Sequence, residues 1–441
     1  DSGDTITIPA GATITNSGTQ TGFGRTGTVN WVTTKKTANF TAVSGEGYFC
    51  DTSSGAFTLT LPSSPSAGDI VGLKDYSGDF ATNNLTIGRN GSPINGASAA
   101  DVTIATNGAS IVLVYVDATQ GWVATQDDSS LITGASFIEA TGGTITTSGS
   151  DKIHTFTGPG TFTVSSLSSA PANNQVSYMV VAGGASGGFD DGGGGGGAGG
   201  FREDKSPTTS YTASPLEGAG PITVTAAAFP ITVGAGGASR TSASAGSPGT
   251  NSVFSTITSA AGGGGGTRPG SPDAIAGGSG GGGGGKGPPQ SPSGAGNTPP
   301  VSPAQGFPGG TGNSNETCQS LGGGGGGATA AGENRTVIQP AGGAGGAGAT
   351  TEISGSSTAY AGGGGGGGHG TQPSPGGACG GAGGPGGGGA GSGKQNTTGG
   401  IAGTANTGGG GGGGSQINPS GGSRTSGAGG SGIVIIRYRF A

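Results

Sequence analysis

The sequence predicts an all-β protein in which strands support a bundle of polyglycine-II helices. Six runs of five or more consecutive glycines stand at 192–197, 262–266, 281–285, 322–327, 362–368 and 408–414. Apolar segments on either side of this glycine field, at 176–181 and 433–438, are typical of buried strands. We therefore expect a fibre-like β ribbon, a small β sandwich or barrel, and a β domain with a large glycine-rich insertion.

The composition of the glycine field by itself favours disorder, because its Gly and Pro content exceeds the usual threshold and no collagen period is present. The ordered alternative is a polyproline-II-like helix with three residues per turn, a rise of about 3.1 Å per residue and no internal hydrogen bonds. Its N–H and C=O groups must then pair with neighbouring chains. Since glycine loses more backbone freedom than any other residue, we expect an all-or-none bundle.

Charge and hydropathy exclude several classes of partner. Of the 441 residues only 9% are charged, and the formal net charge is −6. No basic patch is present to release counterions, which argues against nucleic acid. No apolar run approaches the ~20 residues that cross a bilayer, which argues against membrane insertion. The chain opens at Asp1 without a signal peptide, so we expect processing or a missing upstream portion.

The three cysteines, Cys50, Cys318 and Cys379, show no motif spacing. An odd number without such spacing predicts neither a disulfide framework nor a zinc site. A Cys318–Cys379 pair across glycine turns is the alternative.

Residues 1–30 are predicted to form the fibre-like β ribbon. Ile alternates with Thr in 5–8 and 12–15, which gives one apolar face and one hydroxyl face. An isolated hairpin is marginal in water, so this ribbon needs copies of itself or a neighbouring domain. We expect a homotrimer intertwined at residues 4–30.

Residues 31–128 are predicted to form one all-β domain, a sandwich or barrel with strands about ten residues apart. Asn-Gly turn signals at 90–91, 95–96 and 107–108 separate some of these strands. Trp31 and Trp122, the only two tryptophans, are expected at its core or edge. The expected strands lie at 47–51, 56–61, 69–75, 84–88, 101–104, 110–116 and 121–126.

Residues 129–150 are predicted to be a polar connector, and residues 151–441 a second β domain whose glycine runs lie within 183–432. The last strand, 432–440, should close the sheet, with the glycine runs extending from one end. The other expected strands lie at 152–157, 160–165, 176–181, 222–226, 229–233 and 252–258.

Several strand motifs carry a resemblance to a known family. The segments Ile153-His154-Thr155-Phe156, Tyr178-Met179-Val180-Val181 and Ile433-Val434-Ile435-Ile436 resemble the glycine-rich tip domain of bacteriophage tail-fibre proteins. The part from Gly3 to Asn90 is similar to fibre segments of marine phages. The resemblance covers most of the chain. It implies stacked polyglycine-II helices whose variable loops touch the bacterial surface.

No catalytic constellation is present in the sequence. His154 lies in a strand motif and His369 follows a glycine run, so they form no metal-binding cluster. The carboxylates flanking the first run are compatible with Ca²⁺, but a solvated acidic turn is the preferred interpretation; these are Asp190, Asp191, Glu203 and Asp204. We therefore expect no enzyme, no catalytic residue, no metal and no cofactor.

Recognition residues concentrate in loops displayed on rigid scaffolds. The spacers between the glycine runs carry most of the larger side chains of the field. Aromatic rings offer stacking faces for sugars, although they can equally cover the flanks of the bundle. The candidate receptor contacts are Tyr211, Arg268, Phe307, Tyr360, His369, Lys394, Gln395 and Asn396.

The leading functional hypothesis is a receptor-binding distal tail-fibre protein, located on the virion and therefore extracellular. Its partners would be a bacterial surface glycan or outer-membrane protein, further copies of itself, and other tail or fibre proteins. One alternative is a secreted structural filament or adhesin subunit that assembles through its N-terminal strands. A further alternative is an ice-binding protein, because glycine-rich helical bundles can present flat, regular faces.

Overall fold

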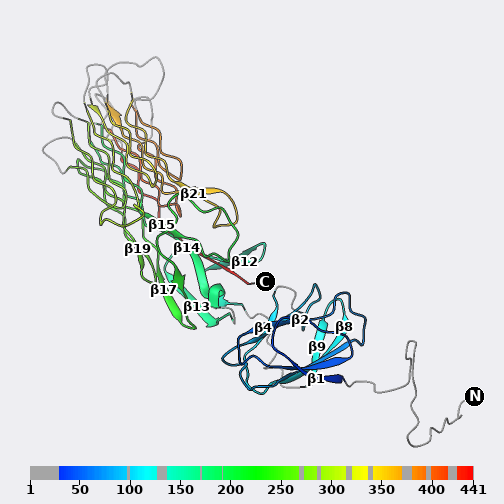
Figure 1. Cartoon of the computed structure of the whole chain (residues 1–441). Helices are drawn as coiled ribbons and strands as arrows, with labels where there is room; N and C mark the ends of the chain where they lie inside the picture. Colours follow the sequence, from blue (N-terminus) through cyan, green and yellow to red (C-terminus); the bar gives the residue numbers. More distant parts are fainter. Residues whose placement is uncertain are drawn as a thin grey trace, which may run out of the picture. The chain divides into compact units, whose positions relative to one another are not determined.

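The computed structural model describes residues 29–96, 100–126, 137–168, 171–190, 192–267, 273–285, 290–313, 320–335, 341–369, 380–393, 399–415 and 425–440. The chain forms two compact units, Asp1–Ala135 and Ser136–Ala441 (Figure 1). The described residues are all-β, with several sheets and no closed barrel. The predicted ribbon lies outside them, except for its last two residues, Val29 and Asn30.

Unit 1 consists of two sheets around one apolar core. The chain passes from one sheet to the other at each step from β1 to β6, so that β1, β3 and β5 pair in parallel, as do β2, β4 and β6. The first sheet contains β1 (Asn30–Lys36), β3 (Glu46–Cys50), β5 (Ile70–Asp75), β8 (Ser110–Asp117) and β9 (Gly121–Gln126). The second contains β2 (Phe40–Thr41), β4 (Phe57–Thr60), β6 (Leu85–Gly88) and β7 (Val102–Ile104).

The predicted strands of unit 1 correspond to β3–β9, while β1 and β2 were not predicted. The two tryptophans of unit 1 differ in burial, because only one of them belongs to the apolar core. Trp122 of β9 is fully buried in the core, whereas Trp31 on the edge strand β1 is 37% exposed and lies beside Phe49. Alternation along β4 sends Phe57 and Leu59 into the core, which closes the space between the two sheets.

Unit 2 also begins with two sheets. One contains β10 (Glu139–Thr141), β13 (Gly160–Ser166), β17 (Ala228–Thr232), β18 (Ser252–Phe254) and β19 (Ile257–Ser259). The other, here called the base sheet, contains β11 (Thr144–Ser148), β12 (Asp151–Phe156), β24 (Ile433–Arg439), β14 (Gln175–Val181) and β15 (Phe201–Asp204), with β16 (Ile222–Thr223) beside β14. The two central strands, β14 and β24, are buried on both faces because apolar clusters lie on either side.

The predicted connector was wrong at its C-terminal end, because residues 139–148 contain β10 and β11. The segment Thr144–Ser148 consists mostly of polar residues, yet it pairs residue by residue with β12 in a hairpin. An edge strand can be polar because only one of its neighbours is a strand. Within the glycine field the structure adds β15 and two small antiparallel pairs. One is β20 (Ser320–Leu321) with β23 (Gly368–His369), which are distant in the sequence, and the other is the hairpin of β21 (Ala349–Thr351) and β22 (Thr358–Tyr360).

The glycine runs extend from the base sheet and bond to one another through their main chains (Figure 1). Around the run 193–200 the bonding partner repeats every third residue. Gly193, Gly196 and Gly199 donate to Gly414, Gly411 and Gly408; Gly194, Gly197 and Gly200 donate to Gly266, Gly263 and Ala260; Gly195 and Ala198 donate to Gly323 and Gly326. The same run accepts main-chain bonds from three further segments, for example from Gly188, Gly282 and Gly364, so it bonds to six neighbouring segments.

Backbones in this bundle lie so close that no side chain fits between them. A Cβ on Gly365 would lie 2.1 Å from the carbonyl oxygen of Gly381, and one on Gly195 would lie 2.0 Å from that of Gly364. On the peripheral segments the larger residues recur at every third position, as in the exposed Pro292, Ala295 and Thr298. The peripheral segments carry side chains where they face away from their neighbours, while small side chains such as those of Ser186, Ala198 and Ser279 are buried within the bundle.

Candidate functional site

The ends of the glycine runs meet at the end of the bundle opposite to the base sheet (Figure 1). We call this surface the run-end face and define it by Gly192, Thr267, Gly285, Asn313, Ser320, Ser392 and Ser415. Main-chain bonds link its members, as in Gly285 N to Gly192 O at 2.7 Å and Gly368 N to Ser392 O at 2.9 Å. The hydroxyls of Ser392 and Ser415 lie 3.1 Å apart.

The described chain leaves this face at residues 267, 285, 313, 369, 393 and 415 and returns at 273, 290, 320, 380, 399 and 425. The departure points are joined to one another by the hydrogen bonds between runs. The points where the chain leaves and rejoins the run-end face therefore lie together on one hydrogen-bonded surface, although they are far apart in the sequence. Sequence reasoning missed Ser392 and Ser415, because nothing in a glycine run indicates which hydroxyl lies beside which.

Half of the predicted receptor contacts lie outside the described residues: Arg268, Lys394, Gln395 and Asn396. For His369 the structure describes only the main chain, which lies in β23 beside β20 at the run-end face. The predicted Cys318–Cys379 pair also lies outside the described residues, while Cys50 is buried in unit 1 with a free thiol.

Two predicted contacts, Tyr211 and Tyr360, are not on the surface. Both belong to the apolar cluster between the base sheet and the bundle and are only 8% and 5% exposed. The prediction that they face solvent was wrong because the spacers that carry them fold back onto the base sheet. The hairpin of β21 and β22 brings Tyr360 into this cluster.

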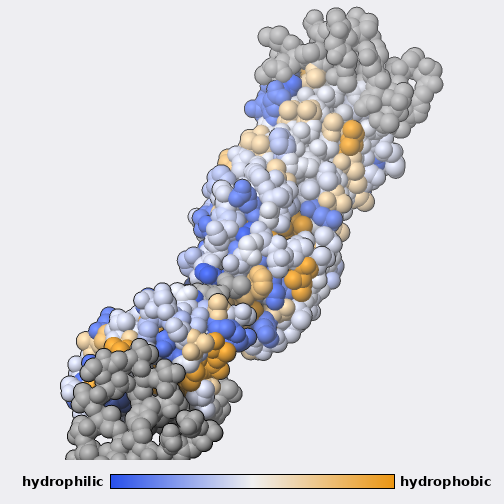
Figure 2. All heavy atoms as spheres, turned by 90° about the vertical axis from the view of Figure 1, so that its right-hand side faces the viewer, coloured by the Kyte–Doolittle hydropathy of each residue, from blue (hydrophilic) through white to orange (hydrophobic). Residues whose placement is uncertain are grey.

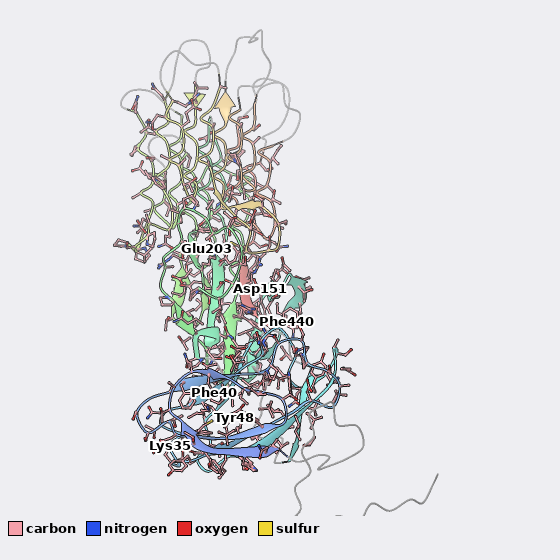
Figure 3. All side chains as sticks on the ribbon, turned by 45° about the vertical axis from the view of Figure 1, so that its right-hand side comes forward. Lys35, Phe40, Tyr48, Asp151, Glu203 and Phe440 are labelled. Atoms are coloured by element: carbon pink, nitrogen blue, oxygen red, sulfur yellow. The ribbon has the colours of Figure 1, made fainter. Side chains whose placement is uncertain are left out.

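Tyr211 also belongs to a polar network centred on Glu203, which lies where the base sheet meets the bundle (Figure 3). The Oε1 atom of Glu203 accepts hydrogen bonds from the hydroxyls of Thr351 at 2.6 Å and Tyr211 at 3.3 Å. Its Oε2 atom accepts a bond from the N–H of Ser214 at 2.9 Å. Burial raises the pKa of Glu203 and of Tyr211. This carboxylate joins β15, the following loop and β21, which is a structural role.

Phe307 is the one predicted contact whose side chain the structure describes at the surface, with 36% exposure. Its carbonyl oxygen accepts a hydrogen bond from Gly280 at 3.0 Å, so its backbone belongs to the flank of the bundle. Figure 2 shows one face of the molecule on which apolar residues are scattered among polar ones. Scattered apolar residues are normal on a soluble surface, so Phe307 by itself indicates no binding patch.

The acidic residues at the first glycine run do not act as one group. Glu203 and Asp204 are buried in β15, where Asp204 accepts a hydrogen bond from the N–H of Gly220 at 2.9 Å. Asp191 lies outside the described residues. Across the described ranges, no three His, Cys, Asp or Glu side chains lie close enough to hold a metal ion.

His154 is a core residue rather than an exposed base. It packs edge-on against Phe162 with 5.0 Å between ring centroids. A carbonyl can only accept, so Nδ1 carries the proton and donates to Gly142 O at 2.7 Å, while Nε2 accepts from the hydroxyl of Tyr438 at 3.0 Å. Burial lowers the pKa of His154 and raises that of Tyr438 to about 12.

Among the residues that the structure describes, no helix is long and apolar enough to span a membrane.

Comparisons with known proteins agree with the glycine-rich character of this fold. No curated protein matches the chain. A family described as a glycine-rich domain matches residues 155–439, which is more than half of the chain. The match includes the glycine bundle and the base sheet, except for β11 and the beginning of β12. This chain therefore belongs to the glycine-rich domain family.

Proposed function

We propose that this protein is the receptor-binding distal protein of a bacteriophage tail fibre, carried on the virion outside the host cell. The observation that supports this most is the anchoring of several connections between glycine runs on the run-end face. Recognition residues concentrate in loops that a rigid scaffold positions. Such a surface can vary its connections without disturbing the bundle, which suits recognition of a bacterial surface glycan or outer-membrane protein.

We further infer that the glycine runs are polyglycine-II helices. Their bonding partners repeat every third residue, and the outward residues of peripheral segments follow the same spacing. A polyproline-II-like helix has three residues per turn and no internal hydrogen bonds, whereas a β-strand alternates with a period of two. The run 193–200 bonds to six neighbouring segments, so a bundle of such helices should be stiff.

Assembly is a separate part of the proposal. An Ile-Thr ribbon cannot bury its apolar face alone, so residues 4–30 would intertwine in a homotrimer and attach to other tail or fibre proteins. Native mass spectrometry of the full chain tests this, and a monomer at micromolar concentration would contradict it. Open-ended polymers would instead favour the filament subunit.

The decisive experiment measures binding of the purified, fluorescently labelled chain to a panel of bacterial strains. Replacing Lys394, Gln395 and Asn396 together by alanine should lower binding to a recognised strain by roughly tenfold or more. The control replaces the exposed Thr144 and Thr146 of β11 by alanine, which should leave binding unchanged. Thermal unfolding should match in all three proteins. Equal binding by the parent and the triple variant would argue against the run-end face as the receptor site.

One observation favours a second candidate, an ice-binding protein. Outward residues at every third position form regular rows on the peripheral segments, including Ala341, Ala344 and Ala347. At about 3.1 Å per residue these rows would repeat every ~9.3 Å. Thermal hysteresis and ice recrystallisation assays on the parent chain distinguish the two functions, because a receptor-binding protein should show neither effect.

A further inference from the structure

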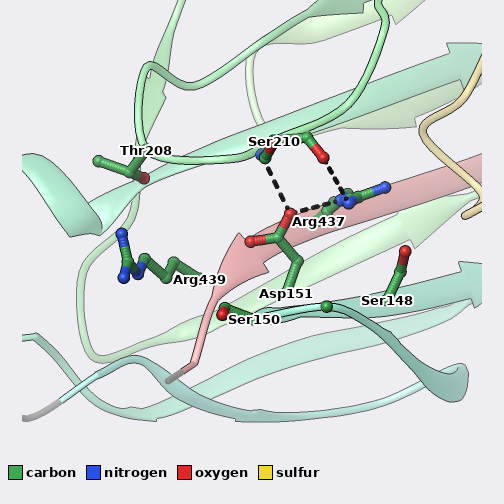
Figure 4. Close-up of a pocket in the computed structure, with 8 residues that line it drawn as sticks. Ser148, Ser150, Asp151, Thr208, Ser210, Arg437 and Arg439 are labelled. Carbon is green, nitrogen blue, oxygen red and sulfur yellow. Dashed lines mark hydrogen bonds and ion pairs between the residues drawn. The ribbon is translucent and has the colours of Figure 1, made fainter. Parts of the chain in front are cut away.

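A small polar cavity lies at the edge of the base sheet in unit 2, away from the run-end face. Its volume is about 270 Å³. Three parts of the chain line it: residues 148–151 at the turn between β11 and β12, the loop residues Thr208 and Ser210, and Arg437 and Arg439 from the end of β24 (Figure 4). All of these residues are polar or glycine, so the cavity offers many hydrogen-bonding groups. We call it the polar pocket.

A buried ion pair fixes one wall of the polar pocket. Arg437 Nε donates to Asp151 Oδ2 at 2.8 Å, and the two side chains are only 3% and 5% exposed. The Nη2 atom of Arg437 donates to the carbonyl oxygen of Ser210 at 3.0 Å, and its Nη1 atom donates to that of Glu352 at 3.2 Å. Tyr211 covers the guanidinium, with 4.9 Å to the ring centroid. These contacts hold the pair in one geometry.

In that geometry two donors reach the same one of the two carboxylate oxygens of Asp151. Its Oδ2 atom accepts both Arg437 Nε and the N–H of Ser210, the latter at 3.3 Å. Its other oxygen points toward the side of the cavity where Arg439 and Thr208 lie (Figure 4). A rigid acceptor therefore stands opposite a guanidinium and a hydroxyl.

The mixture of groups selects a class of ligand. A carboxylate oxygen only accepts hydrogen bonds, a guanidinium only donates them, and the serine and threonine hydroxyls do both. Neighbouring hydroxyls of a sugar ring also donate and accept in turn, so they complement such a wall. An inorganic anion would be attracted by Arg437 and Arg439 but would also meet the negative charge of Asp151, so phosphate is the competing ligand in the test. The volume lies just below the range typical of drug-sized ligands, which suits a single ring.

We propose that the polar pocket binds one sugar ring of a glycan. The site is distinct from the run-end face and does not depend on it. Asp151 and the Ser and Thr hydroxyls would bond the ring hydroxyls, while Arg437 keeps Asp151 in place. No ring of the lining is available for stacking, so binding rests on hydrogen bonds and should be weak for a monosaccharide.

The test is an NMR titration of the full ¹⁵N-labelled chain with glucose, galactose and mannose, each to about 100 mM, and with inorganic phosphate. At least one hexose should cause saturable shifts of the Ser210 and Asp151 amides. Thr208→Phe fills the rim of the cavity and should weaken this binding by about tenfold or more. The matched control, Thr144→Phe, adds the same ring to an exposed position of β11 outside the lining.

Unfolding temperatures of the two variants must agree for this comparison. Should Thr208→Phe fail to fold, Thr208→Val, which removes only the hydroxyl, replaces it and should weaken binding in the same direction. No saturable shift with any hexose, shifts with phosphate alone, or undiminished binding by the variant would each overturn the proposal. Loss of hexose binding by Thr208→Phe with normal binding to bacteria would separate this pocket from the run-end face.

Discussion

Unit 1 and the glycine bundle bury their interiors in opposite ways. The core of unit 1 is made of large side chains, with Leu59, Leu73 and Trp122 fully buried between two sheets. The interior of the bundle is made largely of main chain, where the run 193–200 bonds to six neighbouring segments. In the first region side chains keep the backbones apart, and in the second their absence lets the backbones meet.

The stabilising terms differ accordingly. Unit 1 relies on apolar burial, about 25 cal/mol per Å² removed from water. The bundle buries little apolar surface and relies on main-chain hydrogen bonds, each worth roughly 1 kcal/mol net, against the high entropy cost of ordering glycine. Removing atoms should therefore damage unit 1, whereas adding atoms should damage the bundle.

The largest expected effect is that of Gly365→Val in the bundle. The new Cβ would lie 2.1 Å from Gly381 O, and the bonds of Gly365 with Gly389 and Gly413 would be disrupted. Each buried group left unpaired costs about 1–3 kcal/mol, against a typical domain stability of about 5–15 kcal/mol. We expect the bundle to unfold or nearly so, with loss of amide protection in hydrogen exchange throughout 362–368.

The matched control is Gly158→Val in the turn between β12 and β13, where a Cβ would meet nothing within 4 Å. It should keep the parental unfolding curve and exchange pattern. Rapid exchange of 362–368 already in the parent chain would contradict the ordered bundle.

A smaller effect is expected from Leu59→Ala in unit 1. Deleting this fully buried side chain from β4 leaves a cavity between the two sheets and should cost about 2–5 kcal/mol. Calorimetry should show the transition of unit 1 shifted to lower temperature and that of unit 2 unchanged. A shift of both transitions by the same amount would show that the two units do not unfold independently.

A still smaller effect concerns pH. Burial holds the pKa of His154 below its ordinary value of 6.5, so the unfolded chain binds the proton more readily than the folded one. The stability contributed by neutral His154 is fully present above about pH 6.5 and is lost as the pH falls toward the lowered pKa. The NMR titration midpoint of His154 should lie below 6.5. A midpoint at or above 6.5 would disprove the buried neutral imidazole.

The smallest effect is expected from Phe307→Ala on the flank of the bundle. Its side chain is partly exposed and packs in neither of the apolar clusters of unit 2, so the unfolding free energy should change by no more than about 0.5 kcal/mol. Tyr360→Ala serves as the contrast, because Tyr360 is buried beneath the bundle and its loss should cost several-fold more. Equal changes in the unfolding free energy would contradict this prediction, because they would show that the Phe307 side chain contributes as much to stability as that of Tyr360.

Much of the strand content was predictable from the sequence, because alternation and turn signals are local. The expected strands at 69–75 and 121–126 correspond to β5 and β9 within a residue, and 176–181 corresponds to β14. The polar β11 and the short β15 were missed, since their partners rather than their composition make them strands. The candidate site was less predictable, because two aromatic residues of the spacers have opposite environments: Tyr360 is buried and Phe307 is exposed.

The sequence by itself determined where a backbone can approach another, because each pure glycine run removes the Cβ that would hold it away. It also determined which positions of the peripheral runs face outward, through triplets such as those with Ala341, Ala344 and Ala347. Only the tertiary structure decided which run bonds to which, since glycine runs are alike and nothing local distinguishes 408–414 from 262–266. The same holds for Arg437 and Asp151, which stand 286 residues apart and become a buried pair only when the last strand closes the base sheet.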